Sequence, residues 1–288
     1  MKTAILTCVN DRRHISPLIF ECYKRLKESF DVSLIVGFSS IEDQVMVAAW
    51  AIEDSGVHSV GRIENIPGKK WNTVLKYAYD SVSNFDNFLI MGDDDSISDE
   101  LFAFAERSMQ VGHYFGVNKS AFVDCSTGKA MIETQKMPNK LIGAGRMISR
   151  HAITQTCFRK WVKVGLDFRA GFIKYPHGQE IMFPVGVADY LIAYDKATGT
   201  SEVRYVGLWP DGAKKSLDHH SELNLVMNGF VPYGLQLDKI HVTDFKTTEG
   251  SNIWPYSILE NRCKPCSFND ATWFMSEAEL KIVKQNRK

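Results

Sequence analysis

The stretch FLIMGDDDSIS, from Phe88 to Ser98, places three consecutive aspartates directly after an apolar run and a glycine. Neighbouring carboxylates repel one another, so the arrangement is costly unless a cation or a water-rich turn offsets their charge. In a turn that leaves a strand, Asp93 and Asp95 can converge on one cation while Asp94 points elsewhere. Carboxylate oxygens suit Mg²⁺ or Mn²⁺, which usually complete their coordination with diphosphate oxygens and water. The triplet is therefore a candidate metal site, and the simpler alternative is a solvated acidic turn before a helix.

Other proteins that use similar acidic strings fit this sequence less well. A calcium-binding loop needs a glycine and later ligands at set spacing, which Ile97 and Ser98 do not supply. Phosphatases of the haloacid dehalogenase type carry Asp-x-Asp on their first strand, whereas strand–helix units precede Asp93 here. A polymerase hairpin with Gly-Asp-Asp would need a further catalytic aspartate, a much longer chain and a basic template channel.

The elements that position the aspartates alternate regularly along the first part of the chain. Short β-prone runs cover residues 4–10, 32–38, 58–63 and 87–92, and helix-like segments cover residues 17–29, 42–54 and 69–81. This succession predicts an α/β fold, a Rossmann-like and mostly parallel sheet flanked by helices. Ligands of such sheets collect at the carboxyl ends of the strands, and GDDD occupies such an end. Ser98, followed by two acidic residues, predicts the start of another helix.

After about residue 125 the pattern is less regular, with glycine-rich loops at residues 143–149, 165–171 and 183–187. We therefore divide the chain into residues 1–125 and a smaller, irregular half, residues 126–288, and expect the two halves to form one continuous domain. The sequence from Ser276 to Glu279 is a capping pattern that predicts a short C-terminal helix.

Composition limits the classes of protein to consider. The 288 residues include 34 Lys or Arg and 34 Asp or Glu, so the net charge is zero, and any contact with nucleic acid must be local. The N-terminus reads as neither a signal peptide nor a membrane anchor, so we expect a cytoplasmic protein. Cysteines are scattered, as in a reduced protein, and the single pair Cys263 and Cys266 lacks the two further ligands of a zinc site.

These motifs together resemble the large family of inverting nucleotide-sugar glycosyltransferases with the GT-A fold, over roughly the first 210 residues. The first half would then bind the nucleotide sugar and the second half the acceptor. The opening ILTCVNDRR resembles the uridine-binding start of that family. By this resemblance, the nucleotide contacts are Thr7, Cys8, Val9 and Asn10, with Arg12 or Arg13 near the phosphates.

The segment PGKKWNTVLKYAYDSVSNFDNFLIMGDDDSIS resembles the family's Asn-containing helix and its Asp-x-Asp strand. The resemblance implies that Lys70 and Asn72 contact the donor, although an ordinary polar helix start would explain them too. It also implies that Asp93 and Asp95 hold the metal and the diphosphate, with Asp94 beside the donor.

Later segments suggest the acceptor side of the reaction. GAGRMISRHAI resembles a glycine-rich segment that contacts donor sugar and acceptor, which implicates Arg146. The region around Ala188-Asp189 resembles the stretch that carries the catalytic base, although the family usually has Glu-Asp there. Asp189 is therefore the candidate base of an inverting reaction, a helix cap is the alternative role, and Asp167 and Asp211 are substitutes.

His241 lies late in the chain, where some GT-A enzymes supply a third metal ligand, and Asp244 is the competing candidate. An imidazole suits Mn²⁺ better than Mg²⁺, and a structural role is the alternative for a lone histidine.

The resemblance implies transfer of a sugar from a nucleotide diphosphate, with UDP preferred, to a hydroxyl acceptor such as a surface glycan or a lipid-linked precursor, with Mn²⁺ or Mg²⁺ as cofactor. One alternative is a phage-type DNA glycosyltransferase that acts on hydroxymethylated bases through the basic regions at residues 146–150 and 214–215. A second is a nucleotidyltransferase, although such enzymes begin with a glycine-rich loop that CVNDRR lacks. A third is a non-catalytic glycan-binding or nucleotide-sugar-binding module, because Ala188 replaces the usual glutamate.

Overall fold

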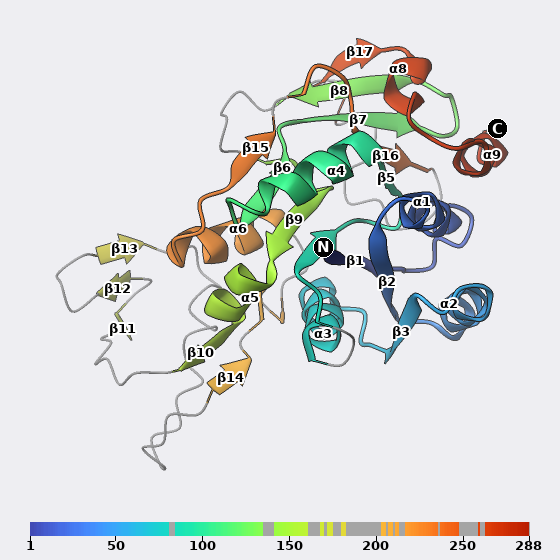
Figure 1. The fold of residues 1–288 in the computed structure, drawn as a ribbon. Coiled ribbons are helices and arrows are strands. Elements are labelled where there is room, and N and C mark those ends of the chain that lie inside the picture. Colours follow the sequence, from blue (N-terminus) through green and yellow to red (C-terminus); the bar gives the residue numbers. More distant parts are fainter. Residues whose placement is uncertain are drawn as a thin grey trace.

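The computed structural model describes residues 1–80, 84–134, 141–160, 168–169, 172–174, 180–182, 203–205, 207–209, 211–212, 217–235, 237–247, 259 and 263–287. Its main element is a seven-stranded sheet in the order β15-β6-β9-β4-β1-β2-β3 (Figure 1). The strands are β1 (Lys2–Cys8), β2 (Asp31–Phe38), β3 (Val57–Arg62), β4 (Asn87–Ile90), β6 (Tyr114–Val117), β9 (Arg146–Ser149) and β15 (Tyr233–Leu235).

Most neighbouring strands of this sheet run parallel. β1 pairs in parallel with β2 and β4, β2 with β3, and β15 with β6, whereas β9 is antiparallel to both β4 and β6. The prediction of an α/β fold with a mostly parallel sheet is therefore confirmed. β9 and β15 come from the chain beyond residue 125, so both predicted halves contribute to one sheet. The division at residue 125 stays a prediction.

Helices cover both faces of the main sheet. One apolar cluster combines side chains of α1 (Pro17–Lys27), α2 (Ile41–Glu53) and α4 (Asp99–Ser108), and a second combines those of α3 (Pro67–Asp80), α5 (Arg150–Cys157) and α6 (Leu217–Met227). Within β1, Ile5 belongs to the first cluster and Leu6 to the second. The central strand is thus apolar on both sides, as strands covered on two faces must be.

The predicted helix starts are explained by their caps. The Ser98 side chain accepts from the backbone N–H of Leu101 at 3.0 Å and begins α4. Ser276 and Glu279 form a reciprocal capping box at the start of α9 (Glu277–Gln285). Both side chains satisfy backbone donors that the first helical turn leaves without partners.

A second, five-stranded sheet has the order β17-β8-β7-β16-β5. Its strands are β5 (Asp95–Ile97), β7 (Lys119–Asp124), β8 (Ala130–Thr134), β16 (Val242–Lys246) and β17 (Lys264–Cys266). α8 (Phe268–Thr272) and α9 pack against it through a third apolar cluster, and α9 lies beside α1 (Figure 1). Within this sheet, β16, from the last part of the chain, pairs with β5, which follows β4.

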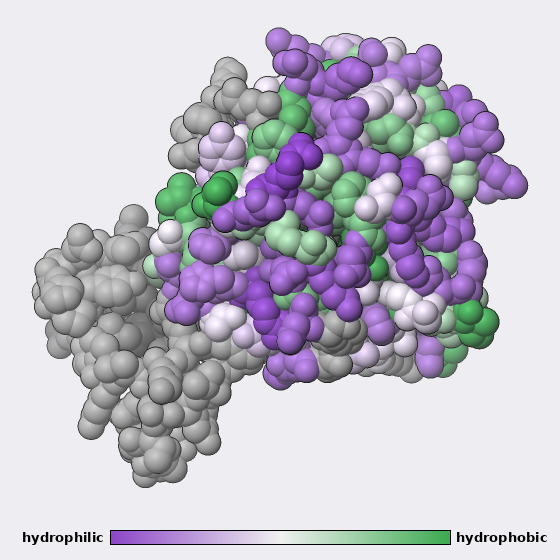
Figure 2. All heavy atoms as spheres, viewed as in Figure 1, coloured by the Kyte–Doolittle hydropathy of each residue, from purple (hydrophilic) through white to green (hydrophobic). Residues whose placement is uncertain are grey.

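The remaining described strands are short. β10 (Phe158–Lys160) pairs with β14 (Val203–Tyr205), and β11 (Phe168–Arg169), β12 (Phe172–Lys174) and β13 (Glu180–Met182) form a three-stranded sheet. Over the described residues, the face in Figure 2 is largely hydrophilic, with hydrophobic side chains scattered across it. None of the helices that the structure describes combines the length and apolar character needed to cross a membrane.

Candidate functional site

Asp93 and Asp94 lie in the turn that joins β4 of the main sheet to β5 of the second sheet, and Asp95 begins β5. The backbone N–H of Met91 donates to Leu6 O at 3.1 Å, which ties the start of the turn to β1. The Gly92 N–H donates to Asp95 Oδ2 at 2.6 Å. A Cβ at Gly92 would lie 2.8 Å from an Asp94 oxygen and 2.9 Å from an Asp95 oxygen, so any larger residue here would displace these two carboxylates.

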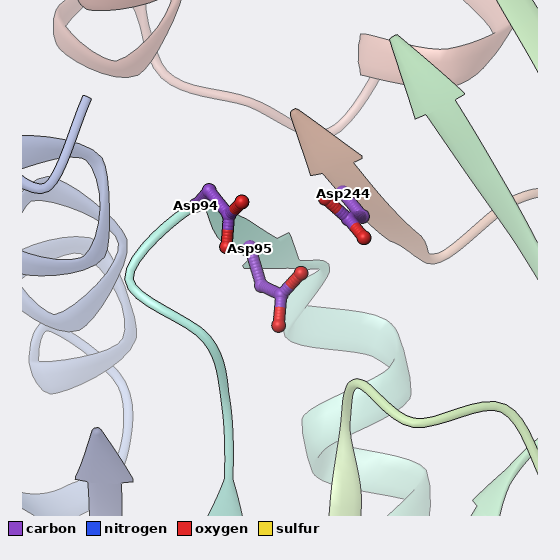
Figure 3. Close-up of side chains that lie close together, drawn as sticks. All are labelled: Asp94, Asp95 and Asp244. Atoms are coloured by element: carbon purple, nitrogen blue, oxygen red, sulfur yellow. The ribbon is translucent and has the colours of Figure 1, made fainter. Parts of the chain in front are cut away.

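Pairing between β5 and β16 brings a distant carboxylate to the triplet. The two strands are antiparallel, and Asp95 is paired with Asp244. Figure 3 shows Asp94 in the turn, Asp95 at the start of β5 and Asp244 on β16. Each residue offers one carboxylate oxygen, and these three oxygens lie within 4.8 Å of one another. Among the described residues, these three aspartates are the acidic, histidine or cysteine side chains that lie close enough together to hold a metal ion.

The surroundings of the cluster make its negative charge costly. Burial raises the pKa of Asp95 well above its usual range, with further contributions from the charges of Asp244 and Asp94. Burial and the charge of Asp94 also raise the pKa of Asp244, to about 6, against the charge of Lys246. Asp94 differs, because burial raises its pKa while Arg12 and Lys246 together lower it below the usual value. A bound cation would relieve this repulsion.

The residues present fit a hard divalent cation. Asp244 Oδ1 is buried and has no hydrogen-bond partner among the described residues. A buried carboxylate oxygen without a partner carries a desolvation cost that metal coordination would remove. All three donors are carboxylates, the ligands that Mg²⁺ and Mn²⁺ prefer over softer ions.

Asp93 has a different environment from the other aspartates. Its side chain is fully buried and accepts hydrogen bonds from Arg12 and from the Ser16 hydroxyl. Burial raises the pKa of Asp93 to about 6, although Arg12 acts in the opposite direction. The structure thus brings Asp94, rather than Asp93, together with Asp95, because Asp93 turns toward the segment that precedes α1.

Two basic side chains contact the cluster. Arg12 Nη1 donates to Asp94 Oδ2 at 2.5 Å, and Lys246 Nζ donates to Asp244 Oδ2 at 2.6 Å. Although burial lowers the pKa of Lys246, the charges of Asp244 and Asp94 raise it above its usual value. With the four aspartates ionised, two positive charges leave a local net charge of −2 (2 − 4), which is the charge that one divalent cation would balance.

His241 lies next to the cluster in the chain but has other contacts. Its Nδ1 is 2.7 Å from the Ser98 hydroxyl and 4.0 Å from Glu100 Oε2. Its ring packs edge-on against Trp273. Of the two candidates for a third ligand, the structure thus groups Asp244 with the triplet and places His241 at the cap of α4.

The predicted nucleotide-binding residues gather at the carboxyl end of β1. Thr7 Oγ1 is buried and has no hydrogen-bond partner among the described residues. The Val9 carbonyl accepts from Lys70 Nζ at 3.2 Å, and Lys70 is itself buried, which lowers its pKa. Asn10 follows in the same turn and is partly buried. These groups share the sheet edge from which the acidic turn leaves.

Asn72, another predicted donor contact, forms hydrogen bonds within the protein. Asn72 accepts from the backbone N–H groups of Leu208 and Trp209 and donates to Trp209 O at 2.6 Å and to Asp211 Oδ1 at 2.7 Å. It therefore fixes the loop that contains Gly207, where a Cβ would lie 2.5 Å from the Asn72 amide.

Arg146 is buried within the main sheet. It donates to Ile142 O at 2.9 Å and to the Tyr114 hydroxyl at 3.1 Å. The candidate base Asp189, its substitute Asp167 and the basic residues 214–215 lie outside the described residues, whereas the second substitute, Asp211, is exposed and bonded to Asn72.

Sequence reasoning missed Lys246 and Ser16. One signal was available: in HVTDFK the charged residues Asp244 and Lys246 lie on either side of the apolar Phe245. Two charged residues at i and i+2 on an otherwise buried strand share a face, which marks a polar site within a core.

No protein-family model matches the chain, and no curated protein matches it. Solved structures similar to it include S. aureus TarS 1–349 in complex with UDP-GlcNAc, at 13% identity over 87% of this chain and 60% of that chain, with a TM-score of 0.49. Another is the mannosyltransferase PcManGT from Pyrobaculum calidifontis in complex with GDP-Man and Mn²⁺, at 10% identity over 99% and 73% of the two chains, with a TM-score of 0.47. A third is 4-diphosphocytidyl-2C-methyl-D-erythritol synthase from Anaerococcus prevotii, at 8% identity over 54% and 73%, with a TM-score of 0.36.

The chain spans 60% of the length of TarS 1–349 and 37% of a longer TarS structure. All of these TM-scores lie below 0.5. The functional proposal below therefore depends on the side chains of this protein.

Proposed function

We propose that this protein is a metal-dependent glycosyltransferase that moves a sugar from a nucleotide diphosphate to a hydroxyl acceptor. The observation that carries the proposal is the convergence of Asp94, Asp95 and Asp244 at the carboxyl-end edge of an α/β sheet. Ligands of such sheets bind at this edge, and a carboxylate-held divalent cation there suits a diphosphate.

The residues around the cluster support a donor that carries phosphates. Thr7, Val9 and Lys70 line the adjacent end of β1, where a nucleoside would lie beside the metal site. Arg12 and Lys246 supply positive charge next to Asp94 and Asp244, respectively. When bound, a divalent cation would offset the charge that develops on the departing diphosphate. The chain's own part is to hold the carboxylates in place and to surround the phosphates with basic groups.

The acceptor and its activation extend the proposal. Asp189 is our candidate for the base that takes a proton from the acceptor hydroxyl, and its geometry lies outside the described residues. The acceptor is a surface glycan, a lipid-linked precursor or a hydroxymethylated DNA base. UDP is the nucleotide that we expect.

The main rival is a nucleotidyltransferase, which also uses paired carboxylates and a divalent cation on an α/β sheet. The two classes differ in their products, because a glycosyltransferase releases a nucleoside diphosphate and a nucleotidyltransferase releases pyrophosphate from a nucleoside triphosphate. Release of UDP or GDP from a panel of nucleotide sugars, measured with Mn²⁺ and with EDTA, separates them. Pyrophosphate release from a nucleoside triphosphate and a sugar phosphate would support the rival instead.

A substitution series links that activity to the cluster. We expect Asp95→Asn and Asp244→Asn each to lower the rate of nucleotide release by about 100-fold or more, because each removes a carboxylate that would hold the cation. The control is Asp80→Asn, an exposed carboxylate on α3 that pairs with Lys76 and should leave the rate unchanged. Wild-type rates in the Asp95 and Asp244 variants would contradict the proposed site.

A further inference from the structure

Arg12 contacts two aspartates that have different surroundings. Its guanidinium donates to Asp94 Oδ2 at 2.5 Å and to Asp94 Oδ1 at 3.3 Å, and also to Asp93 Oδ1. Both oxygens of Asp94 are therefore already occupied by a cation of the protein itself. Asp244 differs, because Lys246 binds Oδ2 while Oδ1 is left without a hydrogen-bond partner among the described residues.

A divalent cation can coordinate Asp94 only if it replaces a hydrogen bond from this guanidinium. The metal ion and the guanidinium are both cations and bind the same carboxylate lone pairs, so binding of one weakens binding of the other. Of the three carboxylates, Asp94 is the one to which Arg12 donates, so the competition occurs at Asp94.

Asp93 keeps Arg12 nearby when its contact with Asp94 is lost. Asp93 is fully buried and accepts from both Arg12 and Ser16. Ser16 in turn donates to the Arg12 backbone carbonyl at 3.0 Å. Arg12 Nη2 is thus held by Asp93, whereas Nη1, whose acceptor is Asp94 Oδ2, can change partner when a cation takes that oxygen.

We propose that Arg12 is an internal counter-cation of Asp94 that the divalent cation displaces, and that the displaced guanidinium then binds the diphosphate of the donor. This inference rests on the proposed function. A planar guanidinium binds phosphate oxygens through two parallel hydrogen bonds, and release from Asp94 makes one side of it available. Cation and diphosphate would then bind cooperatively, because the first prepares a ligand for the second.

The test is calorimetric titration of Mn²⁺ alone into the wild-type protein, Arg12→Gln and Arg13→Gln. Without its competitor, Arg12→Gln should bind Mn²⁺ about threefold to tenfold more tightly, the range expected for loss of one partly buried ion pair. Arg13 is exposed and adjacent, so Arg13→Gln removes the same charge from nearly the same place. It should change the Mn²⁺ affinity by less than about twofold, because exposed charges are screened.

A second titration measures the coupling to the diphosphate, with UDP as the probe. In the wild-type protein, UDP should bind more tightly with Mn²⁺ than with EDTA. In Arg12→Gln that ratio should fall about tenfold, because a charge-assisted phosphate contact is lost only in the metal-bound form. With EDTA, the variant and the wild-type protein should bind UDP equally.

The outcomes separate this inference from the proposed function. Mn²⁺ and UDP binding by the wild-type protein, with Mn²⁺ affinity unchanged or weaker in Arg12→Gln, would overturn the inference alone. Failure of the wild-type protein to bind Mn²⁺ would overturn both. If Arg12→Gln does not fold, because Asp93 is left buried without its partner, the double variant Arg12→Gln with Asp93→Asn removes both charges of that pair. The same increase in Mn²⁺ affinity is then expected, and its absence counts against the inference.

Discussion

The four aspartates of the site have different surroundings in this fold, although three of them are consecutive in the sequence. Asp93 accepts hydrogen bonds from Arg12 and Ser16, and Asp94 also accepts from Arg12. Asp95 accepts from the backbone N–H of Gly92, and Asp244 forms an ion pair with Lys246. Each contact depends on how the side chain leaves a tight turn or a strand. The role of each carboxylate is thus set by neighbours that the triplet itself does not specify.

The raised pKa values at this site give a pH dependence with a definite sign. Burial raises the pKa of Asp93 and of Asp244 from the usual 3.8 to about 6. The folded, metal-free protein then binds protons more tightly than the unfolded chain. This contribution to stability is fully present below about pH 4 and is lost as the pH rises through about 6.

Metal binding should follow the opposite trend, because Mn²⁺ needs ionised carboxylates. We expect a fixed concentration of Mn²⁺ to raise the melting temperature more at pH 7.5 than at pH 5.5, measured by thermal denaturation. Asp54 and Asp124, whose pKa values are lowered, titrate below this window. Asp244→Asn is the control and should abolish the Mn²⁺ effect at both pH values. An equal shift at both pH values in the wild-type protein would count against these carboxylates as the ligands.

At the scale of elements, the strand that carries Asp95 is held from two sides. β16 pairs with β5 on one side. On the other, Ser96 Oγ donates to Glu279 Oε1 at 2.6 Å, and Arg25 donates to Ile97 O at 2.6 Å and to Glu279 at 2.9 Å. Glu279 belongs to α9, so the C-terminal helix fixes the position of a three-residue strand that could not hold itself.

Removal of the Glu279 carboxylate should therefore cost stability. We expect Glu279→Ala to lower the free energy of unfolding by about 3 kcal/mol, since Glu279 is fully buried and Arg25 would lose its buried carboxylate partner and keep, among the described residues, only the partly exposed Asp99 as an ion-pair partner. Glu277→Ala, at an exposed position on the same helix, should change it by less than about 0.5 kcal/mol. Urea denaturation of both variants measures the difference. Equal losses would mean that the network does not hold β5.

For the molecule as a whole, the sequence predicted the parallel half of the main sheet well. Apolar runs such as AILTC and SLIVGF predict buried strands, and the amphipathic segments between them predict helices, so local periodicity is enough to indicate an α/β fold. The second sheet could not be predicted in this way. β5 has three residues, and its partner β16 lies at the other end of the chain, so the pairing carries no local signal.

The same limit applies to the site. Asp95 was a predicted metal ligand because it follows an apolar strand, whereas the position of Asp244 beside it depends on the second sheet. Asn72 and Arg146 were predicted donor contacts, and their polar partners include the backbone around Trp209 and the Tyr114 hydroxyl. The family resemblance implied a contact with the donor for both, but which groups a polar side chain meets depends on tertiary structure.

The central claim is that Asp94, Asp95 and Asp244 hold one divalent cation that carries a nucleoside diphosphate. Crystals soaked with Mn²⁺ and UDP, with anomalous diffraction recorded at the manganese edge, test it most directly. We expect one anomalous peak among the oxygens of these three side chains, in contact with a diphosphate oxygen. Bound UDP with no anomalous peak between the three carboxylates would contradict the claim.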